Sequence, residues 1–118
     1  MKYNNYLVRT RKDGFTLSRG HVFDYEGRTI DGLAIVRLAT APLEFKGPYC
    51  IVDIASGLFV ITGTTSKKKL LKIYEMKHRQ GDIENAILLA RESKVYLERV
   101  LELNEEKKNW RNSGYEVI

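Results

Sequence analysis

The lysine-rich segment from residue 67 to residue 79 carries the side chains best suited to binding an anion. It contains one acid, Glu75, and six basic residues, Lys67, Lys68, Lys69, Lys72, Lys77 and Arg79, so its net charge is +5. The whole chain of 118 residues also has a net charge of +5, so the charges outside the segment sum to zero. A basic segment in an otherwise balanced chain favours a partner with a negative surface.

The pattern around these lysines predicts a basic helix over residues 66–80. Thr65 or Ser66 can cap its start, and Gly81 can end it. Free N–H groups, the hydroxyls of Thr65 and Ser66, and neighbouring ammonium groups would then converge, as they do where proteins bind phosphate. The predicted contacts to an anionic partner are Thr65, Ser66, Lys67, Lys68, Lys69, Lys72 and Arg79. Lysines in the first turn oppose the helix dipole, and a sequence optimised for stability alone would have acidic residues there. The alternative interpretation is a solvated face that only keeps the protein soluble.

A catalytic site is less well supported by the sequence. Arg19, His21 and Tyr25 could together supply the acid, the base and the phosphate contact of a small metal-independent ribonuclease if they shared a groove. His21 and His78 have no second ligand at metal-binding spacing, and Cys50 is the sole cysteine. We therefore expect no metal, no cofactor and no catalytic residue, with Cys50 acting as a buried apolar side chain.

The elements that position these residues indicate an α+β fold in one domain, 1–118. Residues 1–62 form a β-rich half, in which strands over 49–54 and 58–62 flank a turn with Gly57. We expect an antiparallel sheet of about four to six strands, with a C-terminal αα-hairpin packed on one face.

The second helix of that hairpin is expected to be long and amphipathic, spanning residues 82–108. Its apolar stripe is predicted to face the sheet and the first helix. The main stripe consists of Ile83, Ala86, Ala90, Leu97 and Leu101, and it is widened by Leu89, Tyr96, Val100 and Leu103. Leu88 and Val95 fall on the opposite, charged face. Together with Trp110, in a docked tail over 109–118, they form a predicted interface for a protein partner or a second copy.

The run from Asp53 to Ile73 resembles small accessory proteins of phages and mobile elements of Gram-positive bacteria. Such proteins often have a hairpin with a polar glycine turn, then Thr/Ser, then a lysine-rich helix. The resemblance covers about a fifth of the chain and implies a non-enzymatic inhibitor or adaptor acting on host machinery, including anti-defence proteins of the anti-CRISPR type. Many of these inhibitors are acidic mimics of nucleic acid, whereas this chain is basic.

These observations favour a cytoplasmic, non-enzymatic binding protein that engages RNA, DNA or a nucleoprotein enzyme through its basic helix. A protein–protein module or homodimer is the first alternative, and the ribonuclease is the second. No apolar run approaches the length of a membrane span, and the first residues lack the apolar region of a signal peptide, so no membrane partner is expected.

Overall fold

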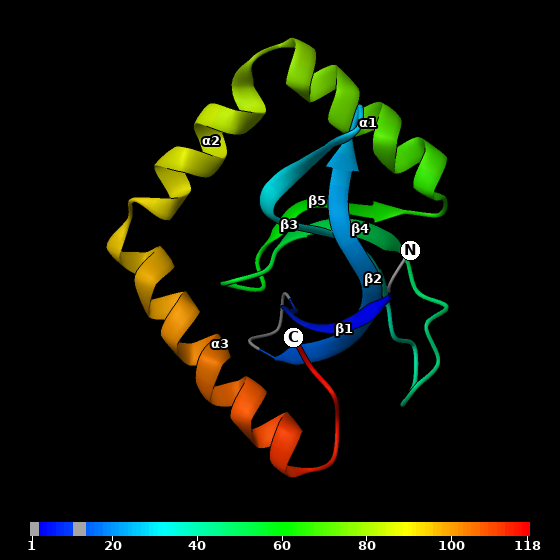
Figure 1. Ribbon diagram of the computed structural model, residues 1–118, viewed down its shortest axis with the longest axis vertical. Helices are drawn as coiled ribbons and strands as arrows, with labels where there is room; N and C mark the ends of the chain where they lie inside the picture. The colour runs from blue at the N-terminus through cyan, green and yellow to red at the C-terminus, as the bar shows by residue number, and fades with distance from the viewer. Residues whose placement is uncertain (1–2, 11–13) are drawn as a thin grey trace.

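The protein folds into a five-stranded antiparallel meander followed by three helices (Figure 1). The computed structural model describes residues 3–10 and 14–118, and for Asp82 it describes the backbone alone. The strands are β1 (Asn4–Arg9), β2 (Phe15–Tyr25), β3 (Arg28–Leu38), β4 (Tyr49–Asp53) and β5 (Phe59–Thr64), and they lie side by side in chain order. The helices are α1 (Lys67–Arg79), α2 (Asp82–Arg91) and α3 (Lys94–Asn112). The predicted α+β class, with the sheet first and the helices after it, is confirmed.

The sheet is strongly curled, so its two faces have different roles. The backbone N–H of Arg9, at the end of β1, donates to the carbonyl of Gly57 in the turn between β4 and β5, at 2.9 Å. One face of β1, β3 and β4 forms a buried cluster of Tyr6, Val8, Ala34, Val36, Cys50 and Val52. Burial raises the pKa of the Cys50 thiol to about 12, so Cys50 is the inert apolar residue that its strand position predicted.

The opposite face of the sheet is covered by the helices in two separate places. α1 lays Leu70 and Tyr74 on Ile35, Ile51 and Ile61, and Ile83 at the start of α2 completes this cluster. The second place is at β1 and the start of β2, where α3 and the tail contribute Leu103 and Val117 against Leu7 and Leu17. Each fully buried aliphatic side chain here contributes about 1.5–3 kcal/mol.

The helix expected over residues 82–108 is divided into α2 and α3. Ser93 has extended ψ, and its Oγ accepts a hydrogen bond from the N–H of Tyr96, so it caps a new helix. The break turns the two helices into an arc around the sheet (Figure 1). It also rephases α3, which directs Tyr96, Leu103 and Lys107 inward.

Of the predicted apolar stripe, Tyr96 and Leu103 therefore face inward, whereas most of the main stripe is not a packing face. Ile83 is buried, but Ala86 and Ala90 are exposed, and Leu97 and Leu101 are about 60% exposed. The tail lies against β1, where the N–H of Ile118 donates to the carbonyl of Asn5 at 2.9 Å. No helix in the described part of the chain is both long and apolar enough to cross a membrane.

We predict that Gly20→Ala destabilises the protein by about 2 kcal/mol or more. A Cβ at Gly20 would lie 1.9 Å from the carbonyl oxygen of Ile35 and 2.7 Å from the Cα of Val36, so β2 and β3 would have to separate. Denaturant unfolding measures the loss. Gly14→Ala is the control, because its nearest atom is the side-chain Oγ1 of Thr10, at 3.1 Å. Equal unfolding midpoints for the two variants would contradict this close approach of the strands.

Candidate functional site

The predicted anion-binding residues begin at the cap of α1. Ser66 occupies the N-cap, and its Oγ accepts from the N–H of Lys69 at 3.2 Å. Lys68, Lys69 and Lys72 are exposed, as is Thr65. Arg79 at the far end is bound to Glu75 at 2.7 Å, so its charge is locally balanced.

Lys67 differs from the other lysines because it points toward the sheet. Its Nζ lies 3.4 Å from Nε2 of His21 and 5.7 Å from the centre of the Tyr3 ring. The Tyr3 and His21 rings meet edge to face, with centroids 5.7 Å apart. The helix and the sheet therefore share a surface at the N-terminal end of α1.

A polar row crosses the whole sheet next to this point. Strand register places its members directly opposite one another, in the order Asn5, Arg19, Arg37, Tyr49 and Thr64. Arg19 and Arg37 lie two residues from His21 and Ile35, which are themselves paired, so the row shares a face with the cluster beneath α1. α1 covers that cluster but does not extend over the row, so Arg19 is exposed and Arg37 is half-buried.

The pairing of Arg19 with Arg37 opposes two like charges on neighbouring strands, an arrangement that costs stability. Their Nε atoms donate to neutral acceptors, the Asn5 side chain at 3.2 Å and the Gly47 carbonyl at 3.1 Å. Neither arginine takes part in any ion pair formed by the described residues. The pair is thus a concentrated positive charge that the fold itself does not neutralise.

An aromatic ring lies under each of three cationic side chains, those of Arg19, Arg37 and Lys67. The Arg19 guanidinium is 4.8 Å from the centre of the Phe45 ring, and the Arg37 guanidinium is 4.9 Å from the centre of the Tyr49 ring. With Lys67 on Tyr3, the cations and rings line a hollow of about 260 Å³. We call this group the basic–aromatic surface; its members are Tyr3, Arg19, Arg37, Phe45, Tyr49 and Lys67.

The constellation expected for a ribonuclease is not assembled. Arg19 and His21 lie beside the N-terminal end of α1, but Tyr25 lies beyond a bulge in β2. Its ring instead meets Tyr74 and His78 near the other end of α1, at centroid distances of 5.0 and 5.3 Å. His78 also forms a hydrogen bond with Glu84. Tyr25 and His78 therefore belong, with Tyr74, to an aromatic cluster that supports α1.

The predicted protein interface is partly used within the chain. Leu88 and Val95 are 57% and 58% exposed. Trp110 is half-buried against Tyr115, and its indole N–H donates to Glu106 at 3.2 Å. Only Leu88 and Val95 therefore remain as open contact residues of that set.

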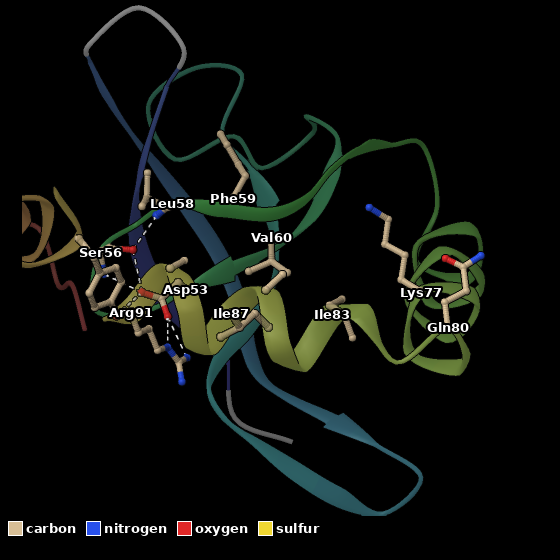
Figure 2. Close-up of a pocket in the computed structure, with 13 residues that line it drawn as sticks. Asp53, Ser56, Leu58, Phe59, Val60, Lys77, Gln80, Ile83, Ile87 and Arg91 are labelled. Carbon is tan, nitrogen blue, oxygen red and sulfur yellow. Dashed lines mark hydrogen bonds and ion pairs between the residues drawn. The ribbon is translucent and has the colours of Figure 1, made fainter. Parts of the chain in front are cut away.

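A second polar cluster is centred on Asp53, at the end of β4 (Figure 2). This cluster was not identified from the sequence. Its carboxylate accepts five hydrogen bonds: two from Ser56, two from Arg91 and one from the Tyr96 hydroxyl. Burial acts to raise the pKa of Asp53, but the hydrogen bonds from Ser56, Tyr96 and Arg91 outweigh it and lower the pKa. Burial and the bond to Asp53 raise the pKa of Tyr96 to about 12, so this phenol remains a donor.

No cluster of three or more metal-binding side chains occurs among the residues that the structure describes. Comparison of the chain with protein-family models, with curated proteins and with solved structures finds no match. The interpretation of the two clusters therefore depends on their own chemistry.

We predict that the Asp53 cluster makes stability depend on pH in the acid range. A carboxyl whose folded pKa lies below its unfolded value, about 3.9, stabilises the fold above that value and loses this contribution as the pH falls through the folded pKa. Denaturant unfolding should show that Asp53→Asn lowers stability at neutral pH and flattens the decline below about pH 4. The control is Asp24→Asn, whose side chain is exposed. An equally steep acid decline in Asp53→Asn and the parent protein would exclude this role.

Proposed function

We propose that this protein binds single-stranded nucleic acid through the basic–aromatic surface, with the exposed lysines of α1 extending the contact. The observation that carries the proposal is the set of three cations around one hollow, each resting on an aromatic ring and none in an ion pair of the described chain. Phosphates would meet the cations, and unstacked bases would meet the rings and the outer faces of the guanidinium groups.

The shape of the surface favours a single strand over a duplex. The row lies on the part of the helix-bearing side of the sheet that α1 leaves uncovered. Splayed bases can lie flat there, as they do on other sheet surfaces that bind single strands. Lys68, Lys69 and Lys72 project from the first two turns of α1 beside it, where they would track the backbone of the strand. The basic helix thus contributes phosphate contacts to a site whose centre is on the sheet.

A host nucleoprotein that displays a single strand would present the same chemistry. The resemblance to small accessory proteins of phages and mobile elements suggests this context, in which the protein would act as an inhibitor or adaptor. The basic charge supports direct binding of the nucleic acid rather than mimicry of it.

We predict that Arg19→Gln combined with Arg37→Gln weakens binding of a short oligonucleotide by at least about tenfold at low salt. Loss of two phosphate contacts should also reduce the slope of log affinity against log salt by about 1.4, at about 0.7 per contact for single strands. Fluorescence anisotropy with labelled single-stranded DNA and RNA, and with the matching duplex, measures both quantities. Removing the opposed charges should leave thermal stability unchanged or raise it.

Two further double variants separate the sheet from the helix. Lys68→Gln with Lys72→Gln tests the exposed lysines of α1 and should have a smaller effect. Lys94→Gln with Lys108→Gln makes the same charge change on α3. This variant should weaken oligonucleotide binding only by the amount that the change in net charge causes. Equal losses in all three variants would show that net charge alone drives binding. Cleavage of the RNA during the measurement would instead support a hydrolytic role for His21.

A second candidate function is self-association through the arc of α2 and α3. Five of the large exposed aliphatic residues lie within fourteen positions of one another, namely Leu88, Leu89, Val95, Leu97 and Leu101, each 57–70% exposed. Exposed aliphatic side chains close together along two helices provide apolar surface that a partner can cover. Twofold dimers are the commonest oligomers, so a second copy is the occupant that we propose.

We predict that the protein forms a weak dimer at high micromolar concentration and that Leu88→Glu with Val95→Glu makes it monomeric. Light scattering measures the mass, and circular dichroism should be unchanged because both side chains are exposed. Val22→Glu, at an exposed position on β2, is the control. A parent protein that is monomeric at this concentration would rule out the dimer.

A further inference from the structure

A separate apolar groove lies between β5 and α2, at the opposite end of α1 from the basic–aromatic surface (Figure 2). Its volume of about 400 Å³ is within the range of small-molecule sites. The walls are Leu58, Phe59 and Val60 on one side and Ile83, Ala86, Ile87 and Ala90 on the other. The groove and the basic–aromatic surface have no lining residue in common.

One end of the groove is closed by the Asp53 cluster, whose carboxylate has no free position for a ligand that donates a hydrogen bond. Asp53 already accepts five hydrogen bonds, and Arg91 directs both its Nε and its Nη2 to Asp53. The hydroxyl of Ser56 donates to Asp53 and accepts from the N–H of Leu58. A ligand reaching this end therefore meets hydrocarbon and a carboxylate that is already fully hydrogen-bonded. Nη1 of Arg91 forms no hydrogen bond with the described residues, but the charge of Arg91 is balanced by Asp53, so this end suits an apolar body.

The other end of the groove carries a positive charge. Arg79 and His78, on the same turn of α1, are bound to Glu75 and Glu84, respectively. Lys77 is in none of the ion pairs that the described residues form. Figure 2 shows the Lys77 side chain reaching from α1 toward β5, with its ammonium group on the side of Val60. The amide of Gln80 is turned away from the groove in the same view.

We propose that this groove binds a small amphipathic molecule that has an apolar chain or ring and a single carboxylate. The apolar part would lie between Val60 and Ile87, over the small side chains of Ala86 and Ala90 that leave the space open. The carboxylate would pair with Lys77 Nζ at the open end. The site is independent of the nucleic-acid proposal and can be tested whether or not that proposal holds.

Isothermal titration of the full chain with decanoate, kept below its micelle concentration, tests the site. Decanol and decyltrimethylammonium have the same chain with a neutral and a positive head, and both should bind more weakly than decanoate. Lys77→Gln should weaken decanoate about fivefold, the size expected for an exposed ion pair. Lys72→Gln, on the same helix, should leave decanoate binding unchanged.

Two filling variants locate the apolar part of the site. Ala86→Trp and, separately, Ala90→Phe should abolish binding, and both residues are exposed, so neither change crowds a buried core. Circular dichroism and unfolding confirm that each variant is folded. Decanol binding as tightly as decanoate, or undiminished binding in both folded filling variants, would overturn the proposal. So would the absence of saturable binding to the parent protein, or equal losses in Lys77→Gln and Lys72→Gln.

Discussion

The arrangement of the helices depends on the buried carboxylate of Asp53. An ionised carboxylate inside a protein costs several kcal/mol unless it is paired and fully hydrogen-bonded. Asp53 meets this condition by taking donors from its own turn, from the end of α2 and from the start of α3. Arg91 and Tyr96 can reach it together because the chain changes direction at Ser93. The same interaction holds α2 alongside β5 with a gap between them, which is the groove.

The curl of the sheet determines which surfaces remain for binding. Its inner side is filled by the strands' own apolar residues, so the helices and the tail must share the outer side. α1 covers the middle of that side, and α3 with the tail covers the part nearest β1. Arg19 and Arg37 lie beside the area that α1 covers, and Lys67, the first residue of α1, borders them. The charged site and the apolar groove are therefore at opposite ends of one short helix.

Local features of this fold could be predicted from the sequence, but long-range pairings could not. Gly57 has positive φ in its turn, and Ser66 caps α1, because both depend on residues close along the chain. The pairing of Arg19 with Arg37 depends on a bulge near Val22; register counted from the turn at Glu26 and Gly27 would have placed Arg19 opposite Ala34. The break at Glu92 and Ser93 has a weak local signal: serine is a preferred N-cap residue, but no glycine or proline lies there to end the preceding helix.

The chain-order topology has a consequence for folding kinetics. Every strand pairs with its neighbour in the sequence, so the row containing Arg19 and Arg37 is built from local contacts that cost little loop-closure entropy. The contacts of Asp53 with Arg91 and Tyr96 span about forty residues, and the bond between Asn5 and Glu116 spans nearly the whole chain. The meander, with the arginine row on its surface, can thus form early in the folding reaction. The groove depends on the long-range contacts of Asp53, so we expect it to form later, when the helices dock.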